Sequence, residues 1–231
     1  MDIHEIINNN NHKVLIDIKK LPIDERKELA DFFSEGSKTL GMALRTLWNK
    51  KLYTTACCKG HLFGERDWMF SRMYSYIAFD KDINVFQYLS DELVSNPYVA
   101  IGTFDYHQAI YFFGRNRDNY MLKFISDIMN KKVINSKYLS SKMNRPLDYE
   151  TMKEVKREYY LDSGFTEDEI KKLNDIDMQY KILKTNKDYV YIPDEEYDKL
   201  FNESVSIYDK LKVRKMSKKR RGRKWKKHKN F

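Results

Sequence analysis

Between residues 37 and 130 the hydrophobic residues alternate between helical and strand-like spacing, and this order restricts the fold more than any other feature. Leu40, Leu44 and Leu47 recur at the spacing of one helix face, whereas residues 74–79 are almost all β-forming. The order helix, strand, strand, helix, strand, strand, helix predicts an α+β fold, with a small four-stranded, mainly antiparallel sheet and helices on one face. The expected helices are 37–50, 82–95 and 119–130, and the expected strands are 52–58, 74–79, 98–103 and 108–113.

The residues on either side of this stretch have a different character. After residue 131 the helical signals return without strong strands, and Gly164 has the position of a helix C-terminal glycine. Thr166 and Glu169 form a capping box, so we expect two helices joined by a short turn. We expect four parts: a polar N-terminal segment at 1–20, the α+β domain at 21–132, a mainly helical region at 133–211 and a disordered basic tail at 212–231.

The two helices joined near Gly164 have the order of a helix-turn-helix, the DNA-binding motif. The expected second helix begins with three acids, residues 167–169. A recognition helix places its first residues close to phosphates, which repel acids. We therefore expect ordinary helical packing here and no reading of DNA bases.

The composition is that of a globular protein, because 42% of its 231 residues are hydrophobic and 14% are aromatic. It holds 2 cysteines, which are adjacent and therefore unsuited to bridge each other, so we expect no disulfide scaffold and a reducing compartment. The N-terminus lacks the pattern of a signal peptide, and no stretch approaches the roughly 20 apolar residues that cross a bilayer. We expect a soluble, cytoplasmic protein without a membrane partner.

The net charge of +9 is a property of the C-terminus. Twelve of the 43 basic residues, and no acid, lie between Lys212 and Phe231, which leaves 31 basic against 34 acidic residues in the rest of the chain. Such a segment cannot bury a core and binds phosphates through counterion release, so we expect nucleic acid as its partner, held mainly by the phosphate backbone. A solubilising tail without a specific role is the alternative. The candidate nucleic-acid-binding residues are Arg214, Lys215, Lys218, Lys219, Arg220, Arg221, Arg223, Lys224, Trp225, Lys226 and Lys227, with Trp225 as a platform for an unpaired base.

The sequence Cys57-Cys58-Lys-Gly60-His61 is the second candidate for chemistry. Neighbouring cysteines on a strand point to opposite faces, and no second C-x-x-C pair exists, so we expect no metal site. A nucleophilic cysteine is a further possibility, in which His107 on the hairpin of the last two strands would serve as the base. Buried cysteines in a β-sheet are, however, usually inert packing, and this is the more common outcome for such a pattern.

A ligand-binding turn is the remaining interpretation of this stretch. Gly60 permits a left-handed turn or the close approach of a ligand, and the loop that follows carries arginines beside aromatic residues. Such a loop could cover an anionic or aromatic ligand such as a nucleotide, or its aromatic residues could extend the core. The candidate ligand-binding residues are Thr55, Cys58, Gly60, His61, Arg66, Trp68, Arg72 and His107.

The stretch from Leu47 to His61, followed by Tyr76-Ile-Ala-Phe79, resembles a small domain of unknown function in proteins of Firmicutes and their phages. The shared pattern is T-x-x-C-C-x-G-H followed by Y-I-x-F. The stretch is also faintly similar to the Ser/Cys-rich motif of the wybutosine-synthesis methyltransferase family, with Cys57 and His61 where that family has Ser and Arg. The second likeness implies a pocket for a nucleotide-like ligand lined by Thr55, Cys57, Cys58, Gly60 and His61.

Three functions are compatible with these features. The favoured one is a phage- or mobile-element-type accessory protein, in the cytoplasm of a bacterial host, that binds nucleic acid or a nucleoprotein machine through its tail and a partner through its α+β domain. The alternatives are a nucleotide-binding protein or enzyme acting at the Cys58/His61 turn, and a protein inhibitor of a host defence nucleoprotein complex. Because no phosphate-binding loop, zinc-protease or serine-hydrolase motif occurs, we favour a non-enzyme without a cofactor. The oligomeric state is left open.

Overall fold

The computed structural model divides the chain into two compact units, Met1–Glu158 and Tyr159–Phe231, which are described separately below. No described helix is long and apolar enough to span a membrane. The residues that the structure describes are 3–9, 16–62, 73–83, 85–103, 107–130, 143–185 and 194–227.

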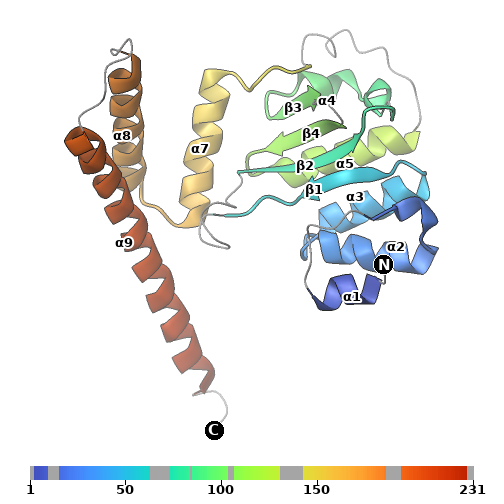
Figure 1. Ribbon diagram of the computed structural model, residues 1–231, viewed down its shortest axis with the longest axis horizontal. Helices are drawn as coiled ribbons and strands as arrows, with labels where there is room; N and C mark the ends of the chain where they lie inside the picture. The colour runs from blue at the N-terminus through green and yellow to red at the C-terminus, as the bar shows by residue number, and fades with distance from the viewer. Residues whose placement is uncertain are drawn as a thin grey trace. The chain divides into compact units, whose positions relative to one another are not determined.

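The first unit is built on a four-stranded sheet with strand order β1-β2-β4-β3. Every neighbouring pair is antiparallel, which confirms the predicted sheet and the hairpin of its last two strands. Figure 1 shows this sheet with α3 and α5 packed along it. The strands are β1 (Thr54–Cys58), β2 (Tyr74–Asp80), β3 (Val99–Thr103) and β4 (His107–Phe113).

The helices of the first unit lie mainly on one face of the sheet, as predicted. The N-cap of α3 is Ser37, whose hydroxyl accepts the N–H of Leu40 at 3.2 Å, so the chain enters this helix with one of its free N–H groups satisfied. The helical elements are α1 (Ile3–Asn8), the 3-10 turn η1 (Ile18–Lys20), α2 (Ile23–Phe33), α3 (Lys38–Asn49), the 3-10 turn η3 (Phe86–Tyr88), α4 (Asp91–Ser95) and α5 (Arg117–Asn130).

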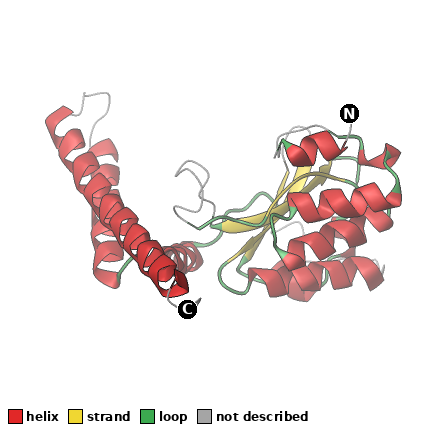
Figure 2. Cartoon of the chain, turned by 90° about the horizontal axis from the view of Figure 1, so that it is seen from below, coloured by secondary structure: helices red, strands yellow, loops and turns green. Residues whose placement is uncertain are grey.

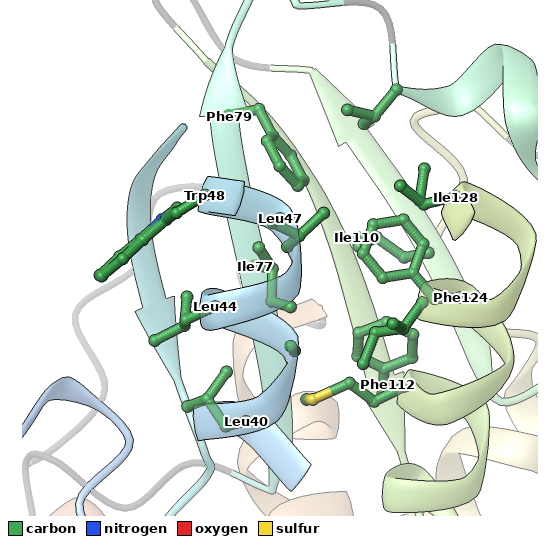
Figure 3. Close-up of a cluster of buried hydrophobic side chains, with 14 of the residues drawn as sticks. Leu40, Leu44, Leu47, Trp48, Ile77, Phe79, Ile110, Phe112, Phe124 and Ile128 are labelled. Atoms are coloured by element: carbon green, nitrogen blue, oxygen red, sulfur yellow. The ribbon is translucent and has the colours of Figure 1, made fainter. Parts of the chain in front are cut away.

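The hydrophobic core lies between this face of the sheet and the helices. In Figure 3, Leu47 points from α3, and Phe124 from α5, toward side chains of β2 and β4. Phe124 is fully buried, and its ring centroid lies 6.0 Å from that of Phe112. Burying a side chain of this size stabilises the fold by about 1.5–3 kcal/mol, so the contact of α5 with the sheet is a main source of stability.

The single helix predicted at 82–95 is interrupted. The 3-10 turn η3 comes first, Leu89 is extended, and α4 begins anew after its N-cap Ser90. The buried carboxylate of Asp127 on α5 accepts hydrogen bonds from the backbone N–H of Ser90 at 2.8 Å and from its hydroxyl at 2.6 Å. Because the N–H of Ser90 is bound by Asp127, it is not available for an intrahelical bond, and the helix cannot run through this position.

One helix contacts the other face of the sheet. The part of α7 (Tyr149–Ser163) that belongs to the first unit places Val155 against Phe113. The hydroxyl of Tyr98 donates to a carboxylate oxygen of Glu154 at 2.5 Å. The first unit therefore continues into α7, and the domain boundary expected at residue 132 falls in 131–142, outside the described residues.

The second unit contains the end of α7, α8 (Glu167–Thr185) and α9 (Asp194–Lys227). The turn between α7 and α8 has the predicted form, since Gly164 has a φ of 100° and the capping box is present. In that box, the N–H of Thr166 donates to Glu169 at 2.9 Å and the N–H of Glu169 donates to the Thr166 hydroxyl at 3.3 Å. Buried apolar residues on α8 and α9 then form the interior of the unit: Ile170, Leu173, Ile176, Leu200, Ile207 and Leu211.

The C-terminal segment that we predicted to be disordered continues α9. Figure 2 shows α9 as one helix, and its 34 residues include 212–227. Lysine and arginine are good helix formers, and cations are favourable at the C-terminal end of a helix. The acids at 194–196 lie at its N-terminal end, where they too suit the helix dipole. The boundary expected after residue 211 is therefore not a break in secondary structure.

Candidate functional site

The Cys58–His61 turn closes the end of β1. Strand β1 ends at Cys58, and Gly60 has a φ of 79°, a left-handed conformation that favours glycine. The N–H of Gly60 donates back to the Cys58 sulfur at 3.4 Å. The predicted turn at Gly60 is confirmed, and the backbone contact fixes the position of the Cys58 side chain within it.

The two cysteines point to opposite faces of the sheet, as expected for neighbours on a strand. Cys57 pairs with Ile77 and packs against the core, whereas Cys58 pairs with Tyr76 on the other face. Burial, with smaller effects from the charges of Cys58 and Glu35, raises the pKa of the Cys57 thiol to about 12. Cys57 is therefore a protonated, inert thiol at neutral pH, which leaves Cys58 as the cysteine available for chemistry.

His61 is held by a residue that sequence reasoning did not identify. Its Nε2 lies 3.3 Å from a carboxylate oxygen of Glu35, and the two side chains are only 8% and 17% exposed. Glu35 lies in the turn between α2 and α3 with a left-handed φ of 49°, and its carbonyl accepts a hydrogen bond from the Lys59 ammonium at 3.1 Å. These two contacts join the Cys58–His61 turn to the α2–α3 turn.

The glycine at position 36 is the local sequence signal for the turn that carries Glu35. Residues with a positive φ often end a helix beside a glycine, and Gly36 follows directly with a φ of 81°. The contact itself spans the helix α3 and the strand β1, so no spacing rule in the sequence could have revealed it.

The structure places His107 away from the turn. His107 is opposite Asp80 in the pairing of β2 and β4, whereas Cys58 is opposite Tyr76 in the pairing of β1 and β2. The four residues between Tyr76 and Asp80 correspond to about 13 Å along the strand, and β2 lies between the two side chains. His107 therefore cannot serve as a base for Cys58, and it belongs to no common site with His61.

Thr55 is also displaced from the turn. The register of β1 against β2 shifts between Thr54 and Ala56, so Thr55 is the extra residue of a bulge, and its side chain is exposed. The neighbouring Thr54 hydroxyl accepts a hydrogen bond from the indole N–H of Trp48 at 3.0 Å. Arg66, Trp68 and Arg72 lie in 63–72, outside the described residues.

An aromatic cluster lies beside Cys58 on the same face of the sheet and was not foreseen. Tyr74, Tyr76, Tyr111 and Phe113 come from adjacent positions of β2 and β4, and their ring centroids lie 5.4–6.2 Å apart. Cross-strand aromatic pairs of this kind stabilise a sheet. The available sequence signal was the alternation of aromatic residues in 74–76 and the aromatic run in 111–113. The cluster strengthens the sheet next to the turn.

The first residue of the basic set has a structural role in the second unit. The Arg214 guanidinium donates to both carboxylate oxygens of Glu169, at 2.6 Å each, and to the carbonyl of Gly164 at 3.3 Å. This bidentate pair, together with hydrogen bonds from Thr166, lowers the pKa of Glu169 to about 2. Arg214 therefore fastens α9 to the start of α8.

The other basic residues up to Lys227 belong to the same helix, α9. Lys218 to Lys227 form the last turns of the helix, and their cations follow in sequence without an intervening acid. In the described part of the chain, no group of three His, Cys, Asp or Glu side chains is placed to hold a metal ion.

Comparison with protein families, with curated proteins and with solved structures found no match to this chain.

Proposed function

We propose that this protein binds nucleic acid through the C-terminal half of α9, mainly by contacts to the phosphate backbone. The observation that carries the proposal is the charge of this segment: residues 212–227 include eleven lysines and arginines and no acid, on one continuous helix. Each cation that neutralises a phosphate releases condensed counterions, which gives strong and salt-dependent affinity with little sequence preference.

The helical form of this segment supports the proposal in two ways. The 16 residues of 212–227 span about 24 Å as a helix, so the cations form an extended rod and not a compact cluster. A single α-helix also fits the major groove of B-form DNA, where the phosphates of both strands are within reach of long side chains. Trp225 lies among the cations and supplies a stacking surface for an unpaired base.

The ion pair of Arg214 separates the supporting part of α9 from the binding part. Because Arg214 is used to hold Glu169, a truncation that removes it would also weaken the hairpin of α8 and α9. A variant that tests binding alone therefore has to leave Arg214 in place.

The test is a binding titration with a four-fold neutralised variant, Lys218→Gln, Lys219→Gln, Arg220→Gln and Arg221→Gln. At low salt we expect this variant to bind a labelled mixed-sequence duplex or single strand at least about tenfold more weakly than the parent protein. The control removes four exposed cations from other positions of the second unit: Lys171→Gln, Lys172→Gln, Lys199→Gln and Lys210→Gln. Equal weakening by both variants would contradict the proposal, since it would reduce the effect to net charge.

The Cys58/His61 turn supports an enzymatic or nucleotide-binding function less well. His61 is engaged with Glu35 and Lys59 with the Glu35 carbonyl, so these groups already serve the junction of two turns. A partner-binding α+β domain and the inhibition of a host nucleoprotein complex stay predictions that follow from the same basic helix.

A further inference from the structure

The face of α9 opposite its packed face is not polar throughout. Leu200, Ile207 and Leu211 are buried in the second unit. Successive helical residues are rotated by about 100°, which places Phe201, Val205, Asp209, Lys212 and Met216 within one narrow stripe on the opposite side. We call these five residues the outer seam.

The outer seam contains large apolar side chains that are exposed to water. Phe201 is 52% exposed and Met216 is 54% exposed, while Asp209 and Lys212 between them are exposed as well. The spacing of the seam, four, four, three and four residues, is close to that of a helix that pairs with another helix. A shallow groove lined by Asn202, Val205, Asp209 and Val213 runs alongside it.

The charge of α9 is divided between its two halves. Residues 194–211 contain six acids and two lysines, which gives a charge of −4. Residues 212–227 contain eleven cations and no acid. In a parallel pair of such helices the two basic halves would lie beside each other and repel. In an antiparallel pair each acidic half would lie beside a basic half and attract it.

We infer that α9 pairs antiparallel with α9 of a second copy of this chain through the outer seam, which makes the protein a two-fold symmetric homodimer. A two-fold interface must be complementary to itself, since the same residues face each other from both copies. If the axis passes between Lys210 and Leu211, Asp209 faces Lys212 of the second copy and Val205 faces Met216 of the second copy. The two-fold axis repeats both pairs, so the centre of the seam holds two apolar contacts and two ion pairs, and Phe201 at each end is level with Arg220 of the second copy.

This dimer is independent of the proposed nucleic-acid binding and compatible with it. At each end of the pair, the eleven cations of one copy lie beside the acidic half of the other with its charge of −4, so a net charge of +7 remains. The two basic ends would then point in opposite directions along a common rod, which offers two phosphate-binding segments to one nucleic acid.

The first measurement is the molar mass of the full chain in nuclease-treated, nucleic-acid-free solution, by sedimentation equilibrium over a range of concentrations. We expect a reversible association to twice the chain mass of 27.9 kDa. A protein that remains a monomer at every concentration overturns the proposal. A monomer whose seam variants change only nucleic-acid affinity overturns it as well, and assigns the seam to nucleic acid.

The second measurement uses charge reversal across the two-fold axis. In Asp209→Lys, two lysines oppose each other at both symmetry-related positions, and in Lys212→Asp two aspartates do. We expect the dissociation constant of each homodimer to rise about tenfold or more. When the two variants are mixed in equal amounts, every reversed residue of one copy faces its opposite charge on the other, so we expect dimerisation to return to near the parent level.

The control for charge alone is Glu203→Lys, a reversal at an exposed position of α9 that lies outside the outer seam. It should dimerise like the parent protein. Circular dichroism of each variant checks that α9 remains helical. The proposal is overturned if the reversed variants dimerise as well as the parent, or if the mixture associates no better than either variant alone.

Discussion

The guanidinium of Arg214 on α9 binds both carboxylate oxygens of Glu169 on α8, with two nitrogen–oxygen distances of 2.6 Å. Glu169 is also the acid of the capping box with Thr166, so one side chain both begins α8 and fastens α9 to it. One of the cations that the sequence assigns to the basic tail therefore stabilises the fold.

We expect Arg214→Gln and Glu169→Gln each to destabilise the second unit by about 1–2 kcal/mol, because each removes a bidentate, partly buried ion pair. Glutamine keeps the capping box at position 169, so the loss there reports on the ion pair. Thermal unfolding of both variants and of the double variant measures the coupling. If the double variant loses the sum of the two single losses, the two side chains do not stabilise each other.

The same pair predicts an acid-dependent loss of stability. The pKa of Glu169 lies at about 2, below its ordinary value of 4.5. A lowered carboxylate pKa contributes stability that is complete above the ordinary value and is lost as the pH falls from 4.5 towards about 2. Thermal unfolding over this range should show a steeper decline for the parent than for Glu169→Gln. Parallel declines would contradict the assignment.

The two cysteines should differ in reactivity. With the pKa of its thiol at about 12, Cys57 should resist alkylation by iodoacetamide at mildly alkaline pH, whereas Cys58, on the other face of the sheet, should be modified. Peptide mapping by mass spectrometry identifies the labelled residue, and Cys58→Ser should leave the native protein unlabelled. Labelling of both residues after denaturation is the control. Equal labelling in the native protein would show that Cys57 does not lie in the core.

The Cys58–His61 turn should act as a structural junction. We expect His61→Ala to lower the free energy of unfolding by about 1–3 kcal/mol, since it removes the imidazole from beside the largely buried Glu35 carboxylate. Cys58→Ser, on the face of the sheet opposite the core, should lower the free energy of unfolding by less. Thermal unfolding compares the two. An unchanged melting temperature for His61→Ala would favour a ligand-binding role of the turn over a structural one.

The core between α5 and the sheet offers a matched pair of substitutions. Phe124 is fully buried against Phe112, and Leu122 on the same helix is 39% exposed. We expect Phe124→Ala to cost about 3–5 kcal/mol and Leu122→Ala much less, because only the former leaves a cavity. Chemical denaturation measures both. Similar losses would mean that α5 does not pack on the sheet in this orientation.

The sequence was sufficient for features that depend on local patterns. The period of the apolar residues predicted the four strands and their antiparallel arrangement, and the residues from Gly164 to Glu169 predicted a turn and a capping box that the structure contains. These features follow from residues within a few positions of one another, where spacing determines which groups can meet.

The features that the sequence did not reveal depend on contacts between distant residues. The interruption between η3 and α4 at Ser90 depends on the carboxylate of Asp127. The position of His61 depends on Glu35, in the turn between α2 and α3. The sequence grouped Arg214 with the other cations of the tail, but its position on the surface of α9 places it against Glu169. No spacing rule links these partners.

The central claim is that the last turns of α9 carry the affinity for nucleic acid. Its most direct test compares the full chain with residues 1–217, which keep Arg214 and lose the cations from Lys218 onward, by fluorescence anisotropy over a series of salt concentrations. The account predicts tight binding by the full chain with a steep salt dependence, and a truncated protein with at least about a hundredfold lower affinity at low salt and a shallower slope. Equal affinities and equal slopes for the two proteins would contradict it.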